Sequence, residues 1–72
     1  MFVYRYYNYK DVYNDEHSGW EVGFFYWEYD NTSKQMQQQF NRVKTFTEAM
    51  KAAEYVHWLN GGTSYYYDNR SR

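Results

Sequence analysis

The chain contains no cysteine, and its aliphatic side chains are scarce, with one leucine and no isoleucine among 72 residues. Without cysteine there is neither a disulfide framework nor a thiolate metal site to stabilise a domain near the lower size limit for a single core. No apolar stretch approaches the length of a membrane span, so we expect no membrane association. The opening residues MFVYRYYNYK also lack the apolar run of a secretory signal.

A strong charge of either sign is missing as well. The formal net charge is −1, which excludes the broad basic field of a duplex-DNA binder. The two histidines, His17 and His57, lie in a predicted loop and a predicted helix, and no nucleophile or dinucleotide motif accompanies them. Gly61-Gly62 follows a predicted helix, whereas a phosphate-binding loop precedes one. We therefore expect no enzymatic activity, no cofactor and no metal ion.

Aromatic residues are abundant instead. They make up 26% of the sequence and include eleven tyrosines. Few aliphatic residues are otherwise typical of disordered chains. Each aromatic ring can bury about 150–250 Å² of surface, so a small number of rings can build a core. The composition therefore predicts a folded domain.

Two segments near the N-terminus are predicted strands. Residues 2–9 and 20–29 alternate and are rich in Tyr, Val and Phe, which suits β-structure. Residues 10–19 between them contain Asn14, Asp15, Ser18 and Gly19, which are typical of a loop.

The next segment, residues 34–45, fits two patterns. Met36, Phe40 and Val43 have helical spacing, and glutamine tolerates a helix. Against this, residues 40, 42, 44 and 46 alternate with residues 41, 43 and 45. We favour a third strand at about residues 38–46, with the preceding glutamines as a solvated strand end or a loop.

A helix is predicted at residues 47–59. Thr47 can cap its N-terminus, with Thr45 and Glu48 as a competing capping box. Asn60-Gly61-Gly62 ends it, because glycine accepts the left-handed conformation that a helix C-terminus requires. Small residues on one face allow close packing on large rings of a sheet: Ala49, Ala52, Ala53 and Val56. Trp58 projects from the opposite, charged side, near Lys51, Glu54 and Tyr55.

These elements predict the α+β fold class, with a three-stranded antiparallel sheet packed on one helix. Residues 1–62 form the single domain and residues 63–72 a tyrosine-rich polar tail. For the tail three alternatives are open: a short extra strand, a segment folded back on the helix, or disorder. The predicted core consists of Phe2, Tyr4, Trp20, Val22, Phe24, Phe46, Ala49, Ala53, Val56 and Leu59.

The stretch WEVGFFYWEYD, residues 20–30, is aromatic on both of its faces. One helix covers only one face of a sheet, so the other face stays open, and Arg5 and Glu21 mark it as the wetter one. Trp, Tyr and Arg together have the composition of a binding hot spot. The aromatic residues of this face and of the exposed side of the helix form the predicted partner-binding set: Tyr7, Tyr9, Phe25, Trp27, Tyr29, Tyr55 and Trp58.

Three kinds of partner can cover such a surface. A second copy can bind by stacking or edge pairing, a different protein can bind, or single-stranded nucleic acid or a nucleotide can stack on the rings. Nucleic-acid binding normally also needs a positive groove, and here nine acidic residues dilute the eight basic ones. We therefore favour a protein partner or self-association, with nucleic acid or a nucleotide as the alternative.

Three motifs carry a family resemblance: WEVGF at residues 20–24, FTEA at 46–49 and VHWLNGG at 56–62. They resemble those of small phage-encoded proteins of unassigned function that form one β-β-β-α unit. The order of elements is also similar to the sheet-plus-helix DNA-binding units at the N-termini of tyrosine recombinases, but this sequence lacks their basic sheet face. The phage resemblance implies an accessory protein of the host cytoplasm that binds and inhibits a host factor, including defence proteins.

Overall fold

The computed structural model describes residues 1–63. Strands β1 (Val3–Lys10), β2 (Glu16–Asp30) and β3 (Gln35–Phe46) form one antiparallel sheet in the order β1-β2-β3. Helix α1 (Ala49–Leu59) follows β3 and contacts all three strands. The predicted α+β fold is therefore confirmed, and the ambiguous segment before the helix is a strand. The three alternatives for the tail concern residues that lie outside the described part of the chain.

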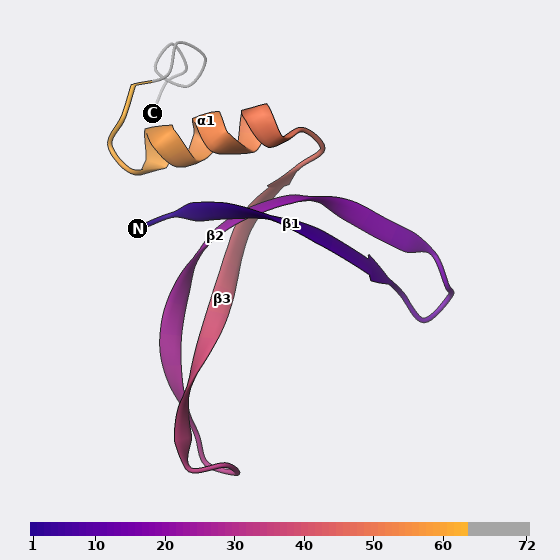
Figure 1. Cartoon of the computed structure of the whole chain (residues 1–72), viewed down its shortest axis with the longest axis vertical. Coiled ribbons are helices and arrows are strands. Elements are labelled where there is room, and N and C mark those ends of the chain that lie inside the picture. The colour runs from indigo at the N-terminus through magenta and orange to yellow at the C-terminus, as the bar shows by residue number, and fades with distance from the viewer. Residues whose placement is uncertain (64–72) are drawn as a thin grey trace.

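The sheet is forked (Figure 1). β1 pairs with β2 from Glu16 to Gly23, whereas β3 pairs with β2 from Trp20 to Asp30. Beyond Gly23, β2 and β3 continue as a two-stranded ribbon, residues 24–30 and 35–41, which we call the arm. In Figure 1 the arm points downward, away from α1 and from the β1–β2 hairpin. The Cα radius of gyration is accordingly 15.3 Å, against about 11 Å for a compact domain of this length.

A β-bulge in β3 lies where the fork begins. Val22 pairs with Lys44 and Gly23 with Arg42, so Val43 has no partner on β2. Successive strand residues point to opposite faces, and the extra residue therefore sends Arg42 and Lys44 to opposite sides of the sheet. The uniform alternation predicted for this stretch is wrong for that reason.

The core is small and lies where α1 crosses the sheet. Val22 and Ala52 are fully buried. Most of the predicted core residues are half-buried around them: Phe2, Trp20, Phe24, Phe46, Ala49, Ala53, Val56 and Leu59. Tyr4 is the exception at 42% exposed. It lies on the edge strand β1, where its ring packs against Trp20 while part of it stays in water.

The loop between β1 and β2 is shorter than predicted, because β2 begins at Glu16 and not at Trp20. Asp11 closes it as a tight turn. Its Oδ1 accepts hydrogen bonds from the backbone N–H groups of Tyr13 at 2.9 Å and Asp15 at 3.0 Å. Asn14 adopts the positive φ of 66° that the turn requires, a conformation that asparagine tolerates well.

The predicted start of the helix is wrong. α1 begins at Ala49, Glu48 is its N-cap residue, and no side chain caps it by a hydrogen bond. Neither Thr47 nor the Thr45 and Glu48 capping box therefore acts as predicted. The Glu48 carboxylate instead pairs with Lys51 one turn along the helix, at 3.4 Å.

The predicted end of the helix is confirmed. Gly61 has a positive φ of 94°. Its N–H donates to the carbonyl of Trp58 at 3.1 Å, and the N–H of Gly62 donates to the carbonyl of His57 at 2.8 Å. This pair of bonds is the Schellman motif, which satisfies carbonyl groups left over at a helix C-terminus.

Asn60 ties this helix end to the beginning of the sheet. Its Oδ1 accepts a hydrogen bond from the N–H of Phe2 at 2.8 Å, and its Nδ2 donates to the carbonyl of Phe2 at 2.9 Å. The side-chain amide therefore pairs with the backbone of Phe2 as a neighbouring strand would. It closes the domain between residues that are 58 positions apart in the chain.

We expect Asn60→Ala to lower the free energy of unfolding by about 2 kcal/mol, because two hydrogen bonds worth about 1 kcal/mol each are lost. Urea denaturation followed by tryptophan fluorescence measures this change. Asn31→Ala in the exposed β2–β3 turn is the matched control and should cost less than about 0.5 kcal/mol. Equal losses in the two variants would contradict a closing role for Asn60.

Candidate functional site: the open face of the sheet

The open face is the side of the sheet that is turned away from α1. On the arm it carries three cross-strand pairs, in which Phe25 faces Phe40, Trp27 faces Gln38 and Tyr29 faces Met36. Four of these side chains are largely in solvent: Trp27 at 63% exposed, Met36 at 56%, Tyr29 at 53% and Phe25 at 44%. Apolar side chains of this size, gathered on one surface, are typical of an interaction site.

At the base of the arm the open face carries a buried carboxylate between two guanidinium groups. The Glu21 side chain is only 8% exposed. It accepts hydrogen bonds from Nε of Arg5 on β1 and, at 2.9 Å, from Nε of Arg42 on β3. Glu21 marks the open face as predicted, but it is not solvated, because the two arginines cover it.

The charge state of Glu21 follows from these contacts. Burial raises the pKa of the Glu21 carboxyl, but the hydrogen bonds and positive charges of Arg5 and Arg42 outweigh burial and hold that pKa below its ordinary value of 4.5. Glu21 is therefore ionised at neutral pH and links all three strands across the open face.

Aromatic rings flank both arginines. The guanidinium of Arg5 lies 3.9 Å from the ring centroid of Phe40 and 5.5 Å from that of Phe25. The guanidinium of Arg42 lies 4.6 Å from the ring centroid of Tyr7. These cation–π contacts fix the arginine side chains while leaving each of them nearly half exposed, at 48% and 44%. The open face therefore combines preformed guanidinium donors with apolar rings.

The far end of the open face lies on the β1–β2 hairpin. The Tyr9 ring stacks on His17, with 5.0 Å between the ring centroids. His17 Nε2 in turn lies 2.9 Å from Oδ2 of Asp11. This hydrogen bond, with backbone donors of the turn, lowers the pKa of the Asp11 carboxyl. The backbone carbonyl of Phe46 and the Tyr7 ring lie close to Gly19 and leave little room for a Cβ there.

The seven predicted site residues fall into two groups. Tyr7, Tyr9, Phe25, Trp27 and Tyr29 share the open face, with the Arg5–Glu21–Arg42 cluster between the two hairpins. Tyr55 and Trp58 lie on α1, on the opposite side of the sheet.

The expectation that Trp58 is an exposed tryptophan is wrong. Its ring is half-buried and packs on Tyr55 with 5.8 Å between the centroids. Tyr55 packs in turn on Phe46 of β3 at 5.4 Å, and Lys44 lies over the Phe46 and Tyr55 rings. The bulge in β3 places Lys44 on this side, and these residues extend the contact between the helix and the sheet.

Sequence reasoning missed three residues of the open face: Met36, Phe40 and Arg42. The pairing of Asp30 with Gln35 across the turn sets the register that brings Phe40 opposite Phe25. The turn residues Asp30 to Lys34 could have indicated this register, because a tight turn there starts the third strand at Gln35. The predicted third strand began only at about residue 38 and therefore left Met36 out.

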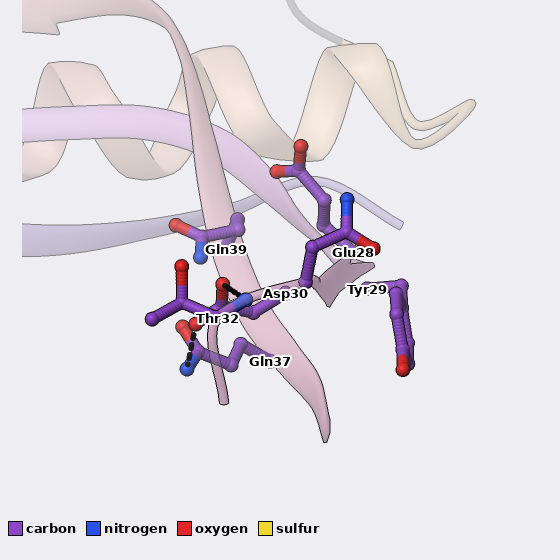
Figure 2. A pocket seen from close by; sticks show the side chains of 7 residues that line it. Glu28, Tyr29, Asp30, Thr32, Gln37 and Gln39 are labelled. Atoms are coloured by element: carbon purple, nitrogen blue, oxygen red, sulfur yellow. Dashed lines mark hydrogen bonds between the residues drawn. The ribbon is translucent and has the colours of Figure 1, made fainter. Parts of the chain in front are cut away.

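The other face of the arm is polar near its tip and forms a shallow hollow (Figure 2). Asp30 organises it by accepting hydrogen bonds from the backbone of Thr32 and from the side chains of Ser33 and Gln37, each at 3.0 Å. In Figure 2 the Tyr29 ring stands apart from these amides and carboxylates. The hydrogen bonds in this hollow therefore hold the β2–β3 turn together, whereas Phe25, Trp27 and Tyr29 lie on the open face.

Within residues 1–63, no group of three or more His, Asp or Glu side chains is arranged to hold a metal ion. In that same part of the chain no helix is long and apolar enough to cross a membrane. Comparison with protein-family models, with curated proteins and with solved structures finds no match to this chain. The resemblance to small phage-encoded proteins therefore stays an expectation.

Glu21→Gln should lower the free energy of unfolding at pH 7 by about 2 kcal/mol, because it removes charge-assisted hydrogen bonds and leaves two neighbouring guanidinium groups unneutralised. Urea denaturation measures this loss. Glu28→Gln, an exposed carboxylate on the same strand, is the control and should change stability by less than about 0.5 kcal/mol.

The same variant tests the pH dependence. A carboxyl with a lowered folded-state pKa contributes stability that is present above its ordinary value of 4.5 and is lost as pH falls through the folded-state pKa. Wild-type stability should therefore decline below about pH 4.5 more steeply than that of Glu21→Gln. Parallel acid profiles of the two proteins would show that Glu21 is not held ionised by the arginines.

Proposed function

We propose that this chain is a non-enzymatic binding module whose open face binds a protein partner. The observation that carries the proposal is the exposure of Trp27, Tyr29 and Met36 on one side of a ribbon that projects from the domain. Exposed Trp and Tyr rings with neighbouring arginines supply most of the binding energy in many protein interfaces.

Charge favours a protein over nucleic acid as the partner. One carboxylate, Glu21, already occupies Arg5 and Arg42, and the net charge of the chain is −1. The attraction for a phosphate backbone is therefore weak. In line with the phage resemblance, we propose an accessory role in which partner binding inhibits a host or defence factor.

Trp27→Ala should weaken partner binding about 30-fold or more, as expected for a hot-spot residue, and leave the free energy of unfolding nearly unchanged. A tagged pull-down from host-type lysate, treated with nuclease, identifies the retained protein, and calorimetry with that protein purified gives the Kd values. Met50→Ala is the control, because Met50 is exposed on α1 away from the open face. A partner that binds wild type and Trp27→Ala equally would exclude the open face as its site, and unfolding of Trp27→Ala would place that ring in the core.

Single-stranded nucleic acid or a nucleotide is the second candidate, favoured by the guanidinium groups of Arg5 and Arg42 beside aromatic rings on the open face. Bases stack on exposed rings, and salt weakens the phosphate contacts.

Short single-stranded DNA or a nucleotide should then quench tryptophan fluorescence at low salt, with less quenching as salt is added. Trp27→Phe should lose most of this quenching and Trp58→Phe, which changes a ring on the helix side, should keep it. Absence of quenching at low salt would eliminate this candidate.

A further inference from the structure

One edge of β2 is unpaired along the arm. β1 pairs with β2 only as far as Gly23, whereas β2 continues to Asp30 with β3 on its other side. Within residues 1–63, no strand covers the edge of β2 from Phe24 to Asp30. Such an edge presents a row of backbone N–H and C=O groups that an added strand can pair with.

The arm is too thin to be stable alone. A two-stranded hairpin is marginal in water, and three or more strands or a covering layer are needed for stability. The fully buried hydrophobic residues, Val22 and Ala52, lie where α1 crosses the sheet. On the arm most of the large side chains are exposed: Phe25, Tyr26, Trp27, Tyr29 and Met36. An added strand would supply what the arm lacks.

The free edge lacks three devices by which proteins block strand addition, which are lysine, proline and bulges along the edge, and its only charged side chains are those of Glu28 and Asp30. From Phe24 to Asp30 the sequence is FFYWEYD, with no basic residue and no proline. The bulge lies at Val22/Gly23, before the free segment begins. By contrast, the edge strand β1 carries Arg5 and Lys10.

The free segment is complementary to itself. Its midpoint is Trp27, and antiparallel pairing about that residue uses the whole segment from Phe24 to Asp30. In this register Trp27 faces its own counterpart and Phe25 faces Tyr29, so aromatic pairs form across the strands. Glu28 faces Tyr26 and Asp30 faces Phe24, so no two carboxylates lie opposite one another.

We infer that the free edge of β2 pairs with the same edge of a second copy, joining the two arms into one four-stranded antiparallel sheet, β3-β2-β2-β3. The two-fold axis runs perpendicular to the sheet, so the open faces of both copies lie on the same side. The inference rests on the proposed function in one respect. The dimer doubles the partner-binding surface, with Phe25, Trp27 and Tyr29 of each copy in one continuous patch.

Tyr26 provides a test that leaves the open face intact, because its side chain lies on the other side of the arm. Tyr26→Glu places a carboxylate opposite the second copy's Glu28, and the two-fold axis repeats this repulsion. Sedimentation equilibrium of the full chain should show wild type at twice the 9.0 kDa mass of the chain. Tyr26→Glu should dimerise roughly ten-fold more weakly, from two repulsive pairs worth a few-fold each.

Adding Glu28→Lys to Tyr26→Glu should restore dimerisation, because opposite charges then face each other across the interface. Gln39→Glu is the matched control. Gln39 lies on β3, directly opposite Tyr26 of β2. Gln39→Glu therefore adds the same charge to the same face of the arm, but one strand away from the free edge, and should leave the dimer intact.

Three outcomes would overturn the inference: a wild-type monomer at the highest soluble concentration, a dimer that Tyr26→Glu does not weaken, or equal weakening by Gln39→Glu. Partner binding is decided separately, by titrating the captured protein with Tyr26→Glu at concentrations where this variant is monomeric. Binding that persists in the monomer keeps the proposed function even where the edge pairing fails. A dimer that captures no partner keeps the edge pairing alone.

Discussion

The sheet depends on the pairing of the ionised Glu21 carboxylate with two arginines. It lies on the central strand and binds one arginine from each neighbour, Arg5 of β1 and Arg42 of β3. A charge this well buried is tolerable only because both of its oxygens are paired. On the open face the three strands are thus joined by ion pairs and cation–π contacts. No second apolar layer packs on this face among residues 1–63. The helix can then be confined to the other face.

The bulge next to Glu21 decides what each face carries. By omitting Val43 from the pairing, it brings Arg42 to the carboxylate and Lys44 to the rings of the helix side. Bulges also increase local twist and bend the strand that contains them. The fork of the sheet at this point (Figure 1) and the projection of the arm away from the helix agree with that effect.

The sequence predicted best those features that depend on neighbouring residues, namely the strands and the end of the helix. Alternation gave the strands, and Gly61 gave the end of the helix, because few other residues accept a positive φ there. Long-range contacts were not accessible in this way. Glu21 looked like a solvated residue because nothing in one strand shows that arginines of two others converge on it. Trp58 looked exposed for a similar reason: helix projection does not show that Tyr55, on which Trp58 packs, is itself covered by Phe46 and Lys44 of β3.

The same lesson applies to the aromatic stretch of β2. Its first half, near Trp20 and Val22, packs beneath α1, and there the aromatic content builds a core that few aliphatic residues could supply. Its second half extends beyond both α1 and β1. Phe25 is partly covered by Phe40 and Arg5, but Trp27 and Tyr29 remain more than half exposed. Core formation therefore explains only half of the stretch. A two-stranded ribbon is only marginally stable in water, and aromatic rings exposed on it contribute little to the free energy of folding unless another surface covers them. This is the strongest reason to regard the arm as an interface.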